Sequence, residues 1–330
     1  MNRRWTLAAR PRGMLKESDF VLGEAPIPPV LEGHVLVRVR FLSFDPTQRG
    51  WLEDRPSYLP PVQIGEVMRA VGVGEVVESK HPGFAQGDLV QGMFGWQDYA
   101  LVPGALLGAK IPAGVPPTWS LGVLGVTGLT AYFGMLDLGK PKAGETVVVS
   151  GAAGATGSIA GQIAKLQGAR VVGIAGGSAK CAWLTKEAHF DAAIDYKHED
   201  VAARLRELCP KGIDVYFDNV GGEILDAVLG QIAQRARIVL CGSISNYNET
   251  TRPPGPRNLS NLVVQRGRME GFIILDYVAR FGEGVAKLSE WVRSGAIVHQ
   301  EDVQHGLENA PRTLLRLFTG ANTGKQILAL

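Results

Sequence analysis

The sequence is poor in the residues that build disulfide frameworks and metal sites. Its 330 residues include three widely separated cysteines, Cys181, Cys209 and Cys241, with no C-x-x-C pair. The six histidines form no H-x-x-x-H pair. This pattern excludes a disulfide-stapled fold and a zinc knuckle, and it predicts a metal-free protein. It also fits a reducing, cytoplasmic setting.

The chain also lacks a strong net charge and a long hydrophobic run. Thirty-four Lys and Arg residues face 32 Asp and Glu residues, so the net charge is +2. A field this weak favours neither nucleic acid nor an anionic membrane as partner. No stretch is long enough to span a bilayer, and Arg10, Arg12 and Lys16 interrupt any leader-like segment. We therefore expect a small-molecule ligand and no nucleic-acid or membrane partner.

Two kinds of periodicity divide the chain, whose length predicts two domains. Up to about residue 120, short alternating runs punctuated by glycine and proline predict a small β-rich domain. From Leu121, longer strands alternate with helices, which predicts an α/β fold with a parallel sheet. The predicted strands of this part are 146–150, 169–175, 192–196, 213–218, 237–241 and 272–275. The predicted helices are 158–167, 202–208, 223–233, 285–292 and 308–318, followed by a last strand at 325–330. An exposed loop is predicted at 251–256.

A glycine-rich turn follows the predicted strand at 146–150. Residues 151–157 read Gly-Ala-Ala-Gly-Ala-Thr-Gly and lead into a helix. Gly151, Gly154 and Gly157 allow a tight turn and close approach of backbone N–H groups to phosphate, and a helix N-terminus favours the anion. We predict that this turn, with Ala155 and Thr156, cradles a dinucleotide pyrophosphate. Because the spelling G-x-x-G-x-x-G, which differs from G-x-G-x-x-G, is a weak signal alone, an ordinary strand-turn-helix joint is the alternative.

The next predicted strand ends in Gly176-Gly-Ser-Ala-Lys180, where such domains meet the adenosine ribose. No Asp or Glu is present there to accept hydrogen bonds from the ribose hydroxyls. Ser178 can donate a hydrogen bond and Lys180 brings a positive charge, which suits the extra phosphate of NADP. The sequence therefore predicts NADPH over NADH. The alternative for Lys180 is a solvated lysine in the first turn of a helix.

A metal-free dinucleotide site favours one kind of chemistry. Without a metal ion as Lewis acid, oxidation of an alcohol requires another group to remove the hydroxyl proton. Hydride delivery to a carbon conjugated with a carbonyl requires only a donor that stabilises the enolate oxygen, and a tyrosine hydroxyl can be that donor. A preorganised donor of this kind lowers the barrier by roughly 2.7 to 4 kcal/mol.

The passages that carry a family resemblance run nearly end to end: residues 7–13, 42–46, 56–65, 125–132, 151–157, 218–222, 241–247 and 322–325. Taken jointly they resemble zinc-independent medium-chain NADPH-dependent reductases of the leukotriene B4 12-hydroxydehydrogenase type. These are also called prostaglandin or alkenal double-bond reductases, and the chain is most similar to their curcumin-reductase-like bacterial branch. The resemblance implies a GroES-like domain of residues 1–120 and 298–330 and a Rossmann NADP-binding domain of residues 121–297. It also implies an active site between these domains and a homodimer joined through the nucleotide domains.

The resemblance further assigns individual residues to the cofactor. It places Gly154 to Gly157 at the pyrophosphate, and Lys180 and Tyr196 at the adenosine phosphate. The residues implied for the other cofactor contacts are Asn219, Cys241, Gly242, Ser243, Tyr247, Phe272, Ile273, Ile274 and Asn322, of which residues 272–274 flank the nicotinamide.

The activity that this resemblance implies is reduction of the C=C bond of α,β-unsaturated ketones or aldehydes. Tyr247 is our candidate catalytic residue, whose hydroxyl meets the substrate carbonyl while hydride goes to the β carbon; a tyrosine that contacts only the cofactor is the alternative. An NADPH quinone oxidoreductase and a non-catalytic NADPH-binding sensor are the competing functions.

One passage departs from the family pattern S-x-D-P-Y-M-R. This chain reads Ser43-Phe-Asp-Pro-Thr-Gln-Arg49, so that Thr47 and Gln48 replace a tyrosine and a methionine. We expect a wider and more polar substrate pocket there, with Tyr58 at its mouth or in plain packing. We expect Arg49 either to form an ion pair with Asp45 that fixes this loop or to lie at the surface.

Overall fold

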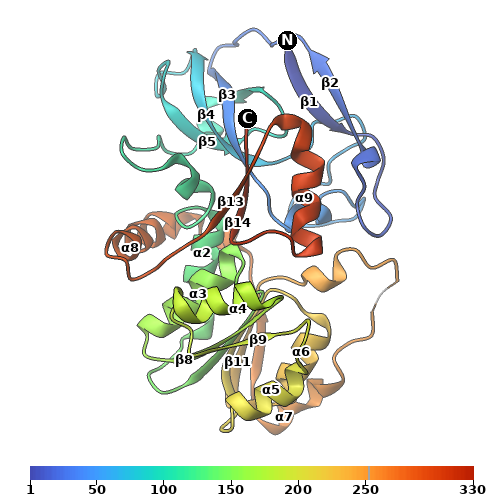
Figure 1. Ribbon diagram of the computed structural model, residues 1–330. Coiled ribbons are helices and arrows are strands. Elements are labelled where there is room, and N and C mark those ends of the chain that lie inside the picture. Colours follow the sequence, from blue (N-terminus) through green and yellow to red (C-terminus); the bar gives the residue numbers. More distant parts are fainter. Residues whose placement is uncertain (252) are drawn as a thin grey trace. The chain divides into compact units, whose positions relative to one another are not determined.

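The computed structural model describes residues 1–251 and 253–330 and divides into two compact units (Figure 1). The first unit comprises residues 1–122 and 301–330, and the second comprises residues 123–300. Arg252, which belongs to the predicted 251–256 loop, lies outside the described residues.

The first unit is built mainly from β-strands, as predicted. Its strands are β1 (Asn2–Leu7), β2 (Phe20–Ala25), β3 (His34–Ser43), β4 (Val71–Ser79), β5 (Leu89–Met93), β6 (Tyr99–Pro103), β13 (Glu301–His305) and β14 (Lys325–Ala329). The main sheet has the order β13-β14-β3-β4-β5, with β6 paired to β3, and β1 pairs with β2. The helices are α1 (Thr47–Gly50) and α9 (Ala310–Thr319). Since β14 pairs antiparallel with β3, the C-terminal segment completes the sheet that the N-terminal segment begins.

An aromatic cluster fills the core of this unit. Trp96 is fully buried, with its ring centroid 5.0 Å from that of Phe20 and 5.3 Å from that of Phe44. Phe44 directly follows β3 and precedes α1. Packing of these large rings therefore fixes where the chain leaves the sheet and enters the short helix that carries Thr47.

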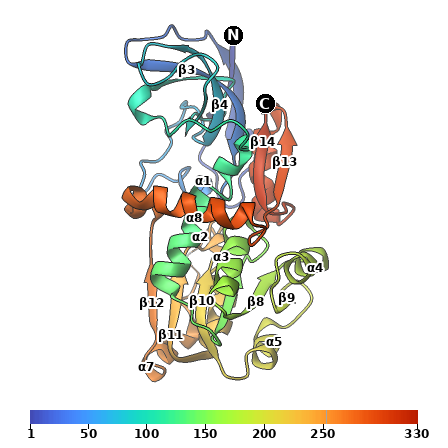
Figure 2. The same ribbon diagram turned by 90° about the vertical axis from the view of Figure 1, so that its left-hand side faces the viewer.

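The second unit is a parallel sheet with helices on both faces (Figure 2). Its strands are β7 (Thr146–Ser150), β8 (Arg170–Ala175), β9 (Ala192–Asp195), β10 (Ile213–Asp218), β11 (Ile232–Leu240) and β12 (Arg268–Gly271). Its helices are α2 (Val126–Phe133), α3 (Ala155–Leu166), α4 (Ser178–Lys186), α5 (Val201–Leu208), α6 (Gly222–Leu229), α7 (Asn261–Val264) and α8 (Phe281–Arg293). The predicted α/β class and Rossmann-type sheet are confirmed.

The strand order explains where a ligand binds. The sheet has the order β12-β11-β10-β7-β8-β9, so the first and fourth strands of the unit are neighbours. Connections leave these two strands in opposite directions, which opens a crevice at their carboxyl ends. Val147, Val148 and Val149 of β7 are all fully buried, as expected for a parallel strand covered on both faces.

The helix after the glycine-rich turn begins three residues earlier than predicted. Helix α3 starts at Ala155, with Gly154 in an extended conformation as its N-cap. Sequence reasoning placed Ala155, Thr156 and Gly157 in the turn because small residues give no apolar periodicity. The backbone N–H groups of these three residues therefore belong to the first turn of the helix, where they precede the intrahelical ladder.

Two other predicted elements are wrong. The helix predicted at 223–233 ends at Leu229, and Ile232 begins strand β11 instead of lying on a helix face. The pairing of β10 with β11 shifts register between Ile213 and Val215, so the irregular start of β11 hid its pattern. The strand predicted at 272–275 lies at Arg268–Gly271, and a 3-10 helix over Ile274–Arg280 follows it. Because β12 is an edge strand with exposed side chains, its polar residues gave no apolar signal.

No helix within the described ranges is long and apolar enough to cross a membrane.

The close contact of α3 with Phe190 generates a stability prediction. A Cβ at Gly161 would lie 2.0 Å from Phe190 Cζ, which is far inside normal contact distance. We expect Gly161→Ala to lower the free energy of unfolding by about 1–3 kcal/mol, because the ring must move. Urea denaturation measures the change. Gly282→Ala in α8 is the matched control, since a Cβ there meets no atom within 4 Å. Equal unfolding free energies for the two variants would refute the proposed contact.

Candidate active site

The predicted cofactor residues of the second unit share one edge of its sheet. Each group directly follows the carboxyl end of a strand: 151–157 after β7, 176–180 after β8, Tyr196 after β9, Asn219 after β10, 241–247 after β11 and 272–274 after β12. Because all six strands are parallel, these ends lie on the same side of the sheet. This edge is where open α/β sheets bind their ligands.

The turn after β7 has the geometry of an anion cradle. Gly151 has a φ of 57°, and Gly154 N–H donates to Gly151 O at 3.0 Å. A Cβ at Gly157 would lie 2.4 Å from Gly151 O, so only glycine lets the helix start this close to the turn. The helical ladder of α3 begins with Ser158 N–H donating to Gly154 O. The preceding N–H groups are the donors that suit a pyrophosphate.

The segments after β8 and β9 are tied together by Asp195. Its Oδ1 accepts hydrogen bonds from Gly177 N–H at 2.7 Å and from Lys197 N–H at 3.1 Å. The Gly177 hydrogen bond and the His198 contact lower the pKa of Asp195. Because Gly176 has no side chain, the ring of Tyr196 lies against it; a Cβ there would be 2.8 Å from the ring.

This arrangement brings the predicted adenosine-phosphate residues to one place. Ser178 and Lys180 lie in the first turn of α4, directly after Gly176 and Gly177. Tyr196 lies against Gly176 from the neighbouring strand end. The backbone amides, the Lys180 ammonium and the Tyr196 hydroxyl at this edge suit a phosphate on the ribose.

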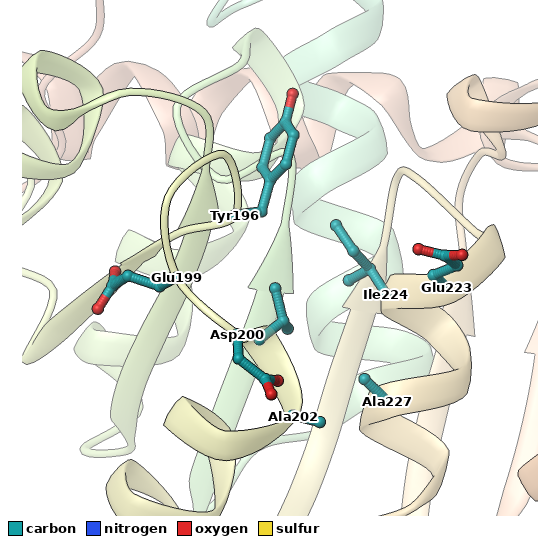
Figure 3. A pocket seen from close by; sticks show the side chains of 8 residues that line it. Tyr196, Glu199, Asp200, Ala202, Glu223, Ile224 and Ala227 are labelled. Carbon is teal, nitrogen blue, oxygen red and sulfur yellow. The ribbon is translucent and has the colours of Figure 1, made fainter.

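A hollow of about 340 Å³ adjoins Tyr196 (Figure 3). It is lined by Tyr196, Glu199, Asp200, Val201, Ala202, Glu223, Ile224 and Ala227. Tyr196 and Ile224 stand on two sides of it, whereas the Glu199 carboxylate points away from Ile224. Its wall combines a flat ring with aliphatic side chains from α5 and α6. Sequence reasoning missed these residues, because nothing in the α5 and α6 pattern distinguishes them from helix surface.

The turns after β10 and β11 pack directly on each other. Asn219 Nδ2 donates to Ser150 O at 2.7 Å, which ties its side chain to the end of β7. A Cβ at Gly221 would lie 2.6 Å from Ser243 Oγ. Burial and the neighbouring Asp218 raise the pKa of the Cys241 thiol to about 12. The Cys241 thiol therefore stays protonated at neutral pH.

The hydroxyl of Tyr247 lies over the same turn. Tyr247 follows a short 3-10 turn, and its Oη accepts a hydrogen bond from Ser243 N–H at 3.3 Å. A Cβ at Gly242 would lie 3.4 Å from this oxygen, so the phenol and the turn are close. An accepted hydrogen bond polarises the phenol and makes its own O–H a better donor.

The segment after β12 has a packing role at its first residue. A Cβ at Gly134 would lie 2.6 Å from the Phe272 ring, which places that ring against the helical segment of residues 134–139. Ile273 is exposed and Ile274 begins the following 3-10 helix. The predicted contact of residues 272–274 with nicotinamide stays a prediction.

Thr47 and Tyr58 of the first unit are brought together. Thr47 Oγ1 and Tyr58 Oη are hydrogen-bonded to each other, and the Tyr58 side chain is half exposed. Gln48, in contrast, is buried, and its amide donates to Ser43 O and Arg69 O at 3.3 and 3.2 Å. The expected polar widening of the pocket therefore does not come from Gln48, which holds the backbone around α1.

The expected roles of Asp45 and Arg49 need correction. Asp45 Oδ1 pairs with Lys325 Nζ at 2.5 Å, which links α1 to the C-terminal strand β14. Arg49 is 2% exposed and bonds to Glu53 and to Gly13 O, both at 3.1 Å. A surface role for Arg49 is wrong. Asn322, in the same unit, donates through Nδ2 to Gly324 O at 3.1 Å, and its cofactor contact stays a prediction.

Comparison with known proteins identifies two families along the chain. Residues 3–109 match the family described as N-terminal domain of oxidoreductase, and residues 155–290 match the family described as zinc-binding dehydrogenase. Among the residues that the structure describes, no three His, Cys, Asp or Glu side chains gather closely enough to hold a metal ion. The residues present do not fit zinc, and zinc independence of the reaction stays a prediction.

Individual relatives match over nearly the whole chain. The NADPH-dependent curcumin reductase of Escherichia coli (strain K12) is 47% identical over 332 residues, covering 99% of this chain and 96% of the relative. The 2-alkenal reductase (NADP(+)-dependent) of Nicotiana tabacum is 41% identical, covering 96% of this chain and 94% of the relative. The crystal structure of CurA in complex with NADPH from Vibrio vulnificus is 43% identical, with a TM-score of 0.94, 99% of this chain and 98% of that chain covered. The chain therefore belongs to the medium-chain dehydrogenase/reductase family, within its group of double-bond reductases.

Proposed function

We propose that this protein is an NADPH-dependent reductase of the C=C bond of α,β-unsaturated ketones and aldehydes. The observation that carries the proposal is Tyr247, a phenol held by Ser243 N–H among the turns that suit a dinucleotide. Relatives named as NADPH-dependent curcumin reductase, 2-alkenal reductase and prostaglandin reductase 1 support the substrate class.

NADPH supplies the hydride for this reaction when it is bound. The chain holds it along the carboxyl edge of the sheet: the N–H groups of residues 155–157 meet the pyrophosphate, and Lys180, Ser178 and Tyr196 meet the ribose phosphate. The hollow beside Tyr196 suits the adenine base, because its wall pairs a flat ring with the aliphatic Ile224. The acidic side chains on its rim exclude the phosphate from the hollow itself.

Tyr247 acts as the hydrogen-bond donor to the substrate carbonyl. As the β carbon accepts hydride, negative charge develops on the carbonyl oxygen, and the polarised phenol stabilises it. A proton from water or from the Tyr247 hydroxyl then adds to the α carbon and completes the reduction. No metal takes part in this step. That the hydrogen-bonded hydroxyls of Thr47 and Tyr58 in the first unit contact the substrate stays a prediction.

We further propose that the protein is a homodimer joined at the edge of the second unit's sheet, and that it works in the cytoplasm. Strand β12 is an edge strand whose outer backbone groups can pair with a second copy. Apolar side chains beside it are exposed: Val263 by 79%, Val264 by 62% and Val278 by 56%. Recovery of the protein in a membrane or periplasmic fraction would contradict the cytoplasmic placement.

The role of Tyr247 is tested by Tyr247→Phe. We expect kcat for a linear enone to fall about 10²-fold, because a donor to the developing oxyanion is lost, while NADPH affinity is retained. NADPH oxidation is followed with an enone and with a quinone, each with and without EDTA. The product mass confirms C=C reduction. Tyr132→Phe, which removes a hydroxyl that donates to Glu283 of α8 and was not predicted to contact cofactor or substrate, is the control.

Three results would contradict this proposal. Wild-type turnover of quinones but not enones would indicate a quinone oxidoreductase. Tight NADPH binding without turnover of either would indicate a sensor. Loss of enone reduction on adding EDTA would overturn the metal-free step.

The cofactor preference is tested by Lys180→Met. We expect the KM for NADPH to rise about tenfold or more, because a charge-assisted hydrogen bond to the phosphate is lost, with the KM for NADH unchanged. Steady-state kinetics with both cofactors give the two values. Lys186→Met, in the last turn of the same helix, is the control. A parallel rise for NADPH and NADH would show that Lys180 does not read the phosphate.

The dimer is tested by the double substitution Val263→Asp and Val264→Asp. Two buried carboxylates at the proposed interface should halve the mass found by light scattering, from twice 35.3 kDa to 35.3 kDa. Leu106→Asp, at a 71% exposed position of the first unit, should leave the mass unchanged. A wild-type mass of 35.3 kDa would rule out the dimer.

A further inference from the structure

Asp218, at the carboxyl end of β10, has an unusual set of partners. It is 1% exposed, and its Oδ1 accepts hydrogen bonds from Ser150 Oγ at 2.9 Å and Tyr216 Oη at 2.8 Å. The same oxygen accepts from the N–H groups of Val220 at 3.0 Å and Gly221 at 2.9 Å. One carboxylate oxygen thus collects four donors from two strand ends.

The backbone of Asp218 reaches a third strand end. Its carbonyl oxygen accepts from Cys241 N–H at 2.9 Å and Gly242 N–H at 3.0 Å. Ser150 Oγ also accepts from Asn219 N–H at 2.9 Å, so the contacts form a closed network. The ends of β7, β10 and β11 all meet at this one residue, at the point in the sheet where the strand order reverses.

Burial of the Asp218 carboxylate is unfavourable in free energy, so a role for this residue must be identified. Asp218 Oδ2 is buried and has no hydrogen-bond partner among residues 1–251 and 253–330. Taking a carboxylate out of water is unfavourable unless the lost hydration is replaced, and here only one of the two oxygens is compensated. Burial, together with the charge of Asp218, raises the pKa of Tyr216 well above its ordinary value, so Tyr216 remains a donor.

Strand pairing alone does not need such a residue. Asp214 lies on the same strand at its amino end, and its Oδ2 accepts from Thr146 N–H at 2.8 Å. This single contact bridges β10 and β7 as well, at the end of the sheet that faces away from the predicted cofactor residues. Asp214 is therefore the structural comparison for Asp218, because it bridges the same two strands with one hydrogen bond.

We propose that Asp218 is a positioning residue that locks the turns after β7, β10 and β11 in the arrangement that binds the nicotinamide half of the cofactor. The inference rests on the proposed NADPH site. Asn219 and residues 241–243 reach the cofactor only if their turns keep a fixed separation, and Asp218 is the atom-level link between them. It touches neither substrate nor cofactor itself.

Ligand titrations separate this role from a general loss of stability. NADPH probes both halves of the site, whereas adenosine 2′,5′-bisphosphate probes only the adenosine end. We expect Asp218→Ala to raise the dissociation constant of NADPH about tenfold or more, because the turns lose their common acceptor. The constant for the bisphosphate should change by less than about twofold, since its site lies at the other end of the edge.

Two further variants complete the test. Asp218→Asn keeps an acceptor oxygen for the Val220 and Gly221 amides, so its NADPH constant should stay within about threefold of wild type. Asp214→Ala should lower the melting temperature but change neither constant. Should Asp218→Ala fail to fold, Ser150→Ala replaces it, with NADPH weakened and the bisphosphate unchanged.

Equal loss of both ligands in Asp218→Ala, or NADPH binding no weaker than in Asp214→Ala, would overturn the proposal. The titrations use no enone. If the wild-type protein binds NADPH but does not reduce enones, the proposed activity is wrong, and the positioning role of Asp218 is unaffected.

Discussion

The pairing of β7 with β10 is the constraint on which the rest of the second unit depends. These strands are parallel neighbours, joined in register from Val147 and Val215 to Val149 and Phe217. Because all six strands run the same way, every loop that leaves a carboxyl end emerges on one side. The glycine-rich turn, the Gly176–Gly177 pair, Tyr196, Asn219 and residues 241–247 are brought together by this geometry alone, although they are spread over almost 100 residues of sequence.

Small side chains and two buried acids then set the detail of that edge. Gly157 allows α3 to begin against Gly151, and Gly176 makes room for the ring of Tyr196. Asp195 and Asp218 each collect backbone N–H groups from the turns beside them. The shape of the edge therefore depends on the absence of side chains at the glycines and on carboxylates that bind backbone N–H groups. The chemistry proposed for Tyr247 depends on the turns that these contacts hold in place.

Much of this was predictable from local pattern, and the failures have physical causes. Short runs of mostly β-branched and aromatic residues identified β7 and β10 to the residue, since such runs are typical of buried parallel strands. Strand β12 was not predicted at its true position because Arg268 and Glu270 are polar, as suits an edge strand. Ile232 was assigned to a helix because helix and strand patterns overlap where β11 begins irregularly. The site residues 199–202 and 223–227 gave no signal, since a hollow between two helices depends on tertiary placement. Asp218 and Lys325 were overlooked because burial of a charge cannot be read from spacing.

The position of β14 has a consequence for how the chain is made. This strand, residues 325–329, pairs with β3 and β13, and its Lys325 is anchored to Asp45 near the start of the chain. On the ribosome, the sheet of the first unit therefore cannot close until residues 325–329 have emerged. The intervening residues 123–300 have by then all emerged, so the nucleotide-binding unit is the first that can complete its fold.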